Sequence, residues 1–345
     1  MKNLRNLILG IGVLCIAVLS AKAQDGSPAS DLVKQGIALY NQGKYADAMA
    51  KYNEVLKTDP ENAYANYEMA YSLYMAKKPQ DAVPYLQKAV KATTGNIGAA
   101  AYSLWASIYD EARDTKNAVA MYREAIKIDP NYPQIYYNFG IAYFRNQQYL
   151  EAEECAIEAI RRNPANASSQ RLYALVTFHQ NKRANALLGF CSFLLLEPTG
   201  ARAAEAYGNI QHIIQGGVLT DAAGKTTITI PSDEDKESNT FNLGIQLVTA
   251  SAKTKNLAGA DLLEYELKSI FSFAGELSAK KTDRSFFDKF FVEYFYKLSQ
   301  TDNMPAFTRT MMLSDTKGDS AKWLKDNATQ ATALNDWVAN TNRGL

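Results

Sequence analysis

The feature that most constrains this chain is an internal repeat with a period of about 34 residues. Pro130, Pro164 and Pro198 recur at this period, and Pro60 precedes Pro130 by two periods and a small insertion. A fixed period of this length is typical of chains in which similar helical units stack, each against its neighbours. The sequence therefore predicts an elongated array of repeats.

Aligned on these prolines, the repeats share small and large residues at fixed positions. Position 8 is always small: Gly36, Ala70, Ala106, Gly140 and Ala174. Position 20 is always alanine: Ala48, Ala82, Ala118, Ala152 and Ala186. Position 24 is large in every repeat but the fourth: Tyr52, Leu86, Tyr122, Ala156 and Phe190. We interpret the small residues as the points where two antiparallel helices approach closely, and the large ones as the fillers of that contact.

This pattern resembles the tetratricopeptide repeat, which has a small residue at position 8, alanine at 20, an aromatic at 24 and proline near 32. The resemblance implies an all-α fold, a right-handed α-solenoid of five repeats and a partial sixth. The expected solenoid spans residues 29–216, with repeats at 29–62, 63–96, 99–132, 133–166, 167–200 and, in part, 201–216. The sixth repeat stops at Gly216-Gly217 and lacks its second helix.

The last third of the chain has a different texture. Residues 217–240 form an expected linker, in which "KTTITI" alternates as a short strand does before Pro231 ends it. Residues 241–345 are expected to form a domain of about five helices. The aromatic stripe of "SFFDKFFVEYFYKL" is interpreted as core, with Asp283 as the N-cap of its helix. Because an unfinished solenoid exposes an apolar end, we expect this domain to close the array.

Residues 1–23 have the pattern of a secretory signal peptide. Lys2 and Arg5 precede an apolar run of about a dozen residues, too short to span a bilayer, and "AKA" precedes Gln24. Leu14 before Cys15 argues against a lipoprotein. We expect an exported protein, periplasmic or secreted, of the kind found in Gram-negative envelopes, with no transmembrane segment after cleavage. Without this segment the basic and acidic residues are nearly balanced, which does not favour nucleic acid as a partner.

No motif for catalysis, cofactor binding or metal binding stands out. The chain lacks a G-x-S-x-G, an H-E-x-x-H, a paired C-x-x-C and a phosphate-binding loop. Its two histidines, His179 and His212, have no plausible third ligand for zinc, and Cys155 and Cys191 are expected to be buried free thiols. We therefore expect no enzyme, no cofactor and no metal. The weaker enzymatic alternative places an active site in the C-terminal helices.

The resemblance also indicates where a partner would bind. In this family the first helix of each repeat lines a concave groove, mainly through positions 2, 5, 9 and 12. Candidate partner-binding residues at or beside these positions are Tyr40, Tyr64, Tyr67, Tyr71, Tyr74, Tyr137, Phe144, Arg171 and Phe178. We expect a scaffold that binds a protein or peptide, with carbohydrate as the alternative ligand because tyrosines also stack on sugars. Another possibility is that these tyrosines are partly core. A binding role requires Tyr67, Tyr71 and Tyr137 to be partly solvent-facing, and Tyr122 at position 24 to be buried.

The signal-peptide interpretation predicts the first residue of the exported protein. N-terminal sequencing of the exported chain should begin at Gln24, because the peptidase cuts after the small-x-small motif. Exported protein that begins at Met1, or at a lipid-modified Cys15, would contradict the interpretation.

Overall fold

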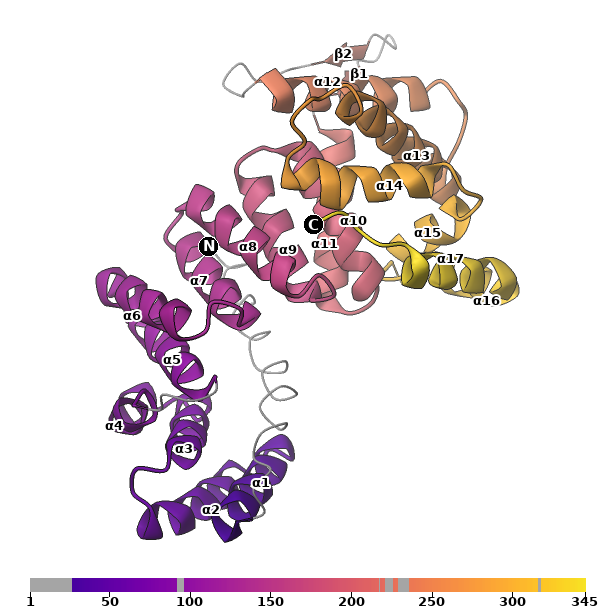
Figure 1. The fold of residues 1–345 in the computed structure, drawn as a ribbon. Helices are drawn as coiled ribbons and strands as arrows, with labels where there is room; N and C mark the ends of the chain where they lie inside the picture. Colours follow the sequence, from indigo (N-terminus) through magenta and orange to yellow (C-terminus); the bar gives the residue numbers. More distant parts are fainter. Residues whose placement is uncertain (1–26, 92–95, 217, 221–225, 229–235, 316–317) are drawn as a thin grey trace. The chain divides into compact units, whose positions relative to one another are not determined.

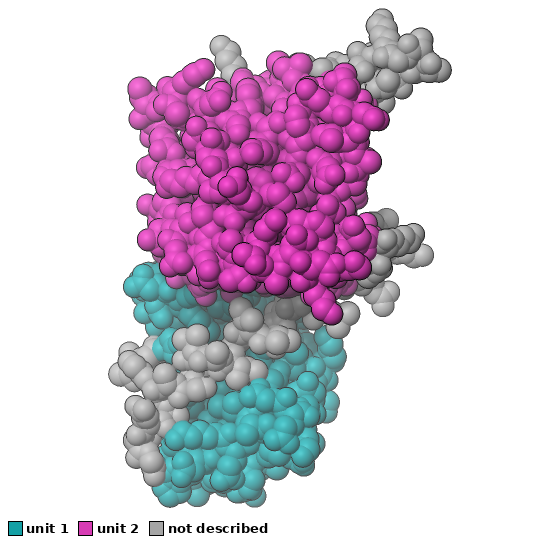
Figure 2. Space-filling model, turned by 90° about the vertical axis from the view of Figure 1, so that its right-hand side faces the viewer, with its two compact units in different colours: residues 1–146 teal, residues 147–345 magenta. Residues whose placement is uncertain are grey.

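A computed structural model of the chain describes residues 27–91, 96–216, 218–220, 226–228, 236–315 and 318–345. In it, the expected repeats one, two, three and five are pairs of packed helices. The expected signal peptide lies outside the described residues. The chain forms two compact units, residues 1–146 and 147–345 (Figure 2). This division falls inside the fourth expected repeat and not after residue 216. No helix within the described ranges is long and apolar enough to cross a membrane.

Unit 1 contains the first three repeats and the first helix of the fourth (Figure 1). Its helices are α1 (Pro28–Asn41), α2 (Tyr45–Thr58), α3 (Ala63–Met75), α4 (Pro79–Ala89), α5 (Ile97–Glu111), α6 (Thr115–Ile128) and α7 (Pro133–Arg145). The first helix of each repeat begins within two residues of the expected repeat start. Each packs on the second helix of its own repeat, α1 on α2, α3 on α4 and α5 on α6, and also on the first helix of the next repeat.

The turn between the two helices of a repeat is set by one residue in the left-handed conformation. This residue always falls at position 15: Gly43, Lys77, Arg113, Gln147 and Asn181, with φ between 59° and 75°. The next amide donates back across the turn, as from Lys78 to the Leu73 carbonyl at 2.9 Å and from Asp114 to the Tyr109 carbonyl at 2.9 Å. This is the six-to-one hydrogen bond that ends many helices. Only repeat one uses glycine for it.

The residues at positions 8 and 24 are buried in all five repeats, and in repeat one the residue at position 8 lies against the one at position 24. A Cβ added to Gly36 would stand 2.3 Å from the Tyr52 ring, and Tyr52 is fully buried. The alanines at position 20 are at most 1% exposed, and Tyr122 is 1% exposed as expected. Burial of a whole tyrosine in this contact requires the facing residue to be small. The interpretation of positions 8, 20 and 24 is therefore confirmed.

Unit 2 contains the second helix of repeat four, the fifth repeat, the partial sixth repeat and the C-terminal helices. The repeat helices are α8 (Tyr149–Arg162), α9 (Ala167–His179), α10 (Arg183–Leu196) and α11 (Ala201–Gln215). After them come two strands, β1 (Val218–Thr220) and β2 (Thr226–Ile228). The C-terminal elements are α12 (Lys236–Ala252), α13 (Gly259–Ser278), a π-helical turn (Asp288–Val292), α14 (Glu293–Ser299), α15 (Met304–Met311), α16 (Ser320–Asp326) and α17 (Ala328–Asn340). The strands pair antiparallel, with Val218 opposite Ile228. The sequence predicted only the second of them.

The C-terminal helices close the array by covering α10. This helix is apolar around most of its circumference, and ten of its residues are buried. It contacts α9, α11, α12, α15 and the π-helical turn. A helix that is hydrophobic on all sides must be enclosed, so the last repeats and the C-terminal helices share one core. The aromatic stripe belongs to this core, where Phe291 stacks on Tyr173 with ring centroids 4.9 Å apart.

Two details of the C-terminal region differ from expectation. It has six α-helices in the described residues, one more than expected, and the first begins at Lys236. The N-cap of the aromatic helix is Ser285 and not Asp283. The Ser285 amide donates to Asp288 Oδ2 at 2.9 Å, and the Asp288 amide donates to Ser285 Oγ at 3.2 Å. This reciprocal capping satisfies two amides at once, whereas Asp283 lies too early in the chain to do so.

The end of the chain is held in the same core by an arginine. Arg343 places its guanidinium carbon 3.8 Å from the ring centroid of Tyr294 and 4.9 Å from that of Phe290. Its Nη1 donates to Ser192 Oγ on α10 at 2.5 Å. Burial lowers the pKa of Arg343 to about 10. The aromatic rings partly replace the hydration that this cation loses.

The packing at position 8 predicts opposite effects for one substitution at two equivalent sites. Gly36→Ala should lower the free energy of unfolding by about 1–3 kcal/mol, because the new methyl group overlaps Tyr52. Gly208→Ala should instead raise it, by up to about 1 kcal/mol. Gly208 holds position 8 of the partial sixth repeat, and an added Cβ there meets open space. Urea unfolding measures both changes. Equal effects would show that position 8 is not a packing constraint.

Candidate functional site

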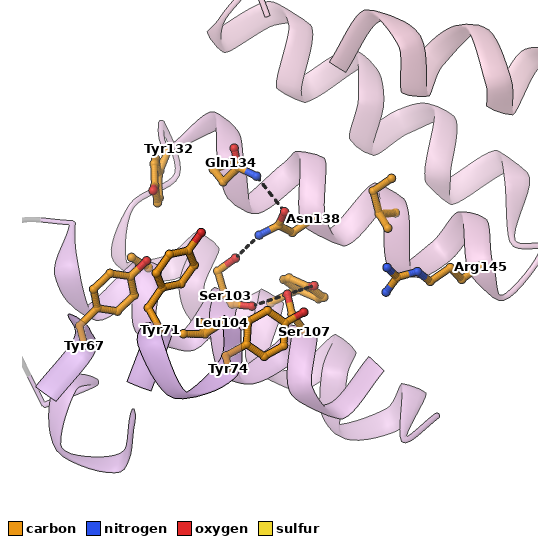
Figure 3. Close-up of a pocket in the computed structure, with 13 residues that line it drawn as sticks. Tyr67, Tyr71, Tyr74, Ser103, Leu104, Ser107, Tyr132, Gln134, Asn138 and Arg145 are labelled. Atoms are coloured by element: carbon orange, nitrogen blue, oxygen red, sulfur yellow. Dashed lines mark hydrogen bonds between the residues drawn. The ribbon is translucent and has the colours of Figure 1, made fainter. Parts of the chain in front are cut away.

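A pocket opens in unit 1 between the first helices of three consecutive repeats, α3, α5 and α7 (Figure 3). Its volume is about 40 Å³. Its aromatic wall comes from α3, its floor from α5, and its polar wall from α7 and the turn before it. The residues that line it are Tyr67, Tyr71, Tyr74, Ala100, Ser103, Leu104, Ser107, Tyr122, Tyr132, Gln134, Asn138, Ile141 and Arg145.

The pocket exists because one repeat has small residues where its neighbour has large ones. Positions 2, 5 and 9 of repeat three hold Ala100, Ser103 and Ser107, all on α5. The same three positions of repeat two hold tyrosines. The helices keep the repeat spacing whatever these side chains are, so the missing volume on α5 is left as a hollow.

The aromatic wall is formed by tyrosines that pack on one another. Tyr67 and Tyr71 stack with ring centroids 6.2 Å apart, and Tyr71 contacts Tyr40 of α1 at 5.4 Å. The hydroxyl of Tyr74 donates to Glu111 Oε1 at the end of α5. Burial, followed by this hydrogen bond, raises the pKa of Tyr74, so its hydroxyl stays protonated and can donate.

The opposite wall is a chain of amide and hydroxyl groups (Figure 3). Gln134 Nε2 donates to Asn138 Oδ1 at 2.8 Å, and Asn138 Nδ2 donates to Ser103 Oγ at 3.2 Å. On the floor, the hydroxyls of Ser107 and Tyr122 lie 3.0 Å apart. These bonds fix the donors and acceptors of the pocket in one arrangement before any ligand binds.

One charged pair borders the pocket. Arg145 Nη1 donates to Asp110 Oδ2 at 2.7 Å, and the Asp110 side chain is only 3% exposed. Arg145 Nη2 is also buried, but it has no hydrogen-bond partner among the described residues. A buried guanidinium nitrogen without an acceptor is costly. The pocket therefore contains a donor whose bonding capacity is unused.

The structure brings only some of the predicted partner-binding residues together. Tyr67, Tyr71 and Tyr74 line the pocket. The expectation that Tyr67 and Tyr71 are partly solvent-facing is wrong, because they are 5% and 9% exposed. Their rings pack on each other and, through Tyr71, on Tyr40, which is 7% exposed. Tyr137 on α7 is partly exposed but lies outside the pocket lining.

The other predicted residues lie elsewhere. Tyr64 packs against the apolar cluster of Val33, Val55 and Ala65, and Phe144 is 6% exposed on α7. Arg171 and Phe178 belong to unit 2. Arg171 pairs there with Glu205 at 2.7 Å, and Phe178 contacts the ring of Phe190 at 6.2 Å. None of these four residues lines the pocket.

The polar residues of the pocket were not predicted from the sequence. Ser103, Ser107, Gln134, Asn138 and Arg145 are common residue types that no motif marks. The sequence does contain one indication of the pocket. Three groove positions of repeat three lack large side chains, whereas the preceding repeat has four tyrosines at its groove positions. Small residues at groove positions are not detected when only aromatic residues are considered as binding candidates.

Other reactive groups in the described ranges lie outside this pocket. Burial raises the pKa of the Cys155 thiol to about 12 and that of Cys191 further, so both are poor nucleophiles. Cys191 is buried as expected, whereas Cys155 is only partly buried. His179 stacks on Tyr149, and burial lowers its pKa. No group of three histidine, cysteine or acidic residues suited to a metal occurs within the described part of the chain.

The chemistry of the pocket is that of hydrogen bonding and aromatic contact. Its groups are neutral phenols, hydroxyls and amides with one ion pair at the edge, and they donate and accept hydrogen bonds. A ligand there would be held by aromatic contact and by the open donor of Arg145.

Comparison with known proteins agrees with the architecture. A family model described as tetratricopeptide repeat matches residues 33–97 and 137–192, and a second, described as TPR repeat, matches residues 113–147. The matched segments contain both helices of most repeats, and the second model covers α6 and α7.

Individual relatives are distant. The chain is 27% identical over 147 residues to a probable UDP-N-acetylglucosamine–peptide N-acetylglucosaminyltransferase SPINDLY of Hordeum vulgare, over 41% of this chain and 16% of that protein. It is 27% identical over 131 residues to tetratricopeptide repeat protein 6 of Homo sapiens, over 38% of this chain and 25% of that protein. The chain therefore spans a quarter or less of these relatives.

Among solved structures, PilF of Pseudomonas aeruginosa is similar with a TM-score of 0.48 and 16% identity, over 69% of this chain and 96% of that one. The repeat register, the helical hairpins and the matching family models lead to the same assignment. Residues 33–97 and 113–192 of the chain therefore consist of tetratricopeptide repeats.

Proposed function

We propose that this protein is a non-catalytic scaffold that binds an extended segment of a partner protein along α3, α5 and α7. The observation that carries this proposal is the pocket between these three helices. The aromatic wall and the polar wall face each other across the pocket and belong to consecutive repeats. A site that holds one anchoring side chain of a partner requires such an arrangement.

The size of the pocket favours a polypeptide over a carbohydrate. Sites that enclose a small ligand usually have volumes of roughly 300–1,000 Å³, whereas this pocket has about 40 Å³. Such a hollow suits one side chain of a chain that continues along the groove. Stacked tyrosines can also bind sugars, so carbohydrate is kept as an outcome of the test.

The hydrogen-bonding groups support the same assignment. Gln134 and Asn138 present amides, Tyr74 keeps a neutral hydroxyl, and Arg145 has a buried donor without an acceptor in the described residues. A peptide carbonyl or a polar side chain in the pocket would satisfy that donor. The gain on binding is largest for a group that was unsatisfied in the free protein.

The cellular setting is the second part of the proposal. Residues 1–23 have the composition of a secretory signal, which supports action outside the cytoplasm. We infer a partner in the bacterial envelope and a role in assembling or maintaining it. The role is to present a preorganised surface, which lowers the cost of ordering the partner.

The experiment is a selection of phage-displayed random dodecapeptides on the purified chain, with a glycan array in parallel. Ala100→Leu should weaken binding of the selected peptides by about tenfold or more, because the larger side chain fills the floor of the pocket. Ala120→Leu is the matched control. It makes the same change on an exposed position of α6 and should leave affinity unchanged.

Urea unfolding separates a filled pocket from a damaged fold. If Ala100→Leu also unfolds more easily, Gln134→Ala gives an independent test, because this residue lines the wall and is only partly buried. Peptides that bind both pocket variants as tightly as the original chain would contradict the proposal. Binding to glycans alone would replace it with the carbohydrate alternative.

A further inference from the structure

One buried acid on the first helix of repeat two has no partner among the residues that the structure describes. Glu68, on α3, is 8% exposed. Its carboxyl group makes no hydrogen bond or ion pair with any residue in the described ranges, and burial raises its pKa. Carboxylates at this depth are normally paired, because an isolated buried charge is strongly unfavourable. Glu68 is therefore either neutral or available to a cation that no described residue supplies.

The repeat shows which way Glu68 faces. It holds position 6 of repeat two, and the same position in repeats three and four is Leu104 and Asn138. Both of these side chains line the pocket. Equivalent positions on equivalent helices point the same way, so Glu68 faces the groove one repeat earlier, between α1 and α3.

The surroundings of Glu68 are aromatic. Glu68 acts electrostatically on Tyr52, which lies at the contact of α1 and α2 and is also influenced by Tyr40. Tyr40 in turn contacts the ring of Tyr71, one helical turn along α3 from Glu68. Because Glu68 is buried, charge interactions of its carboxyl group are screened less than those on the surface. Tyrosine rings also attract cations by their π faces.

Acidic side chains outnumber basic ones on the first helices α1, α3, α5 and α7. Neither α3 nor α5 carries a lysine or an arginine. Lys34 of α1 is half exposed and lies 3.7 Å from Asp31. Farther along the groove, Glu111 accepts a hydrogen bond from Tyr74, and Asp110 pairs with Arg145. The groove therefore has an excess of acidic groups, which favours a basic partner segment.

We propose that Glu68 pairs with a lysine or arginine side chain of the partner protein, which enters the groove between α1 and α3. The inference rests on the proposed function and adds a chemical requirement to it. Burial raises the pKa of Glu68 to about 7. Near neutral pH, a small favourable interaction with a cation is therefore enough to shift Glu68 to its ionised form. An incoming cation supplies that interaction and at the same time removes the cost of an unpaired buried charge.

The test uses the same displayed dodecapeptide library and asks which residues the selected peptides share. They should carry lysine or arginine at one fixed position. Replacing that residue with norleucine or glutamine should weaken binding about tenfold or more to the original chain, but only slightly to Glu68→Gln. Glu54→Gln is the matched control, because it removes the same charge from an exposed site on α2. It should leave the preference for a basic residue intact.

A second measurement, on the free protein, separates a binding role from a structural one. At pH 8, above the raised pKa, Glu68→Gln should unfold at a higher urea concentration than the original chain, because it removes an unpaired charge. A residue that served the fold would show the reverse. If Glu68 serves binding and not folding, Glu68→Gln should bind the peptide less tightly and resist urea better than the original chain.

Each outcome decides something different. Selected peptides without a shared basic residue would overturn this inference and leave the scaffold function intact. A shared basic residue whose contribution survives in Glu68→Gln would overturn the assignment to Glu68, as would a lower stability of that variant at pH 8. Failure to select any peptide would contradict the proposed function, and this inference with it.

Discussion

The close approach of two helices within each repeat is the contact on which the rest of the structure depends. At Gly36 there is no room for a methyl group beside Tyr52, and the alanine at position 20 of every repeat is buried. Because the distance between the two helices is fixed by these small residues, residue types can vary freely only on the outer faces of the helices. One face of each first helix then lines the groove. The spacing between successive first helices does not depend on the side chains on that face.

This separation of roles explains how a pocket forms without disturbing the fold. Residues at the groove positions are not needed for the pairing of helices, so repeat three can hold Ala100 and Ser103 where repeat two holds tyrosines. The same freedom allows an acid such as Glu68 to remain in the groove. Unit 2 has less of this freedom, because the C-terminal helices cover α10. Arg171 and Phe178 form contacts within that unit, with Glu205 and Phe190.

The repeat register, the buried positions and the closing role of the C-terminal helices were predictable, because each follows from a period or from an apolar stripe. The left-handed residue at position 15 was not, since Lys77 and Arg113 give no sign of that conformation in sequence. The burial of Tyr67 and Tyr71 was also missed, because it depends on ring contacts along α3 and with the neighbouring helix α1. Ser285 as N-cap and the polar wall of the pocket depend on side-chain geometry that spacing does not encode.

The central claim is that the first helices of unit 1 form the binding surface. Photo-cross-linking tests this most directly, with a selected peptide that carries a benzoylphenylalanine beside its anchoring residue and mass spectrometry to locate the bonds. The account predicts cross-links to α3, α5 and α7. Cross-links confined to the second helices α2, α4 and α6, or to unit 2, would contradict it.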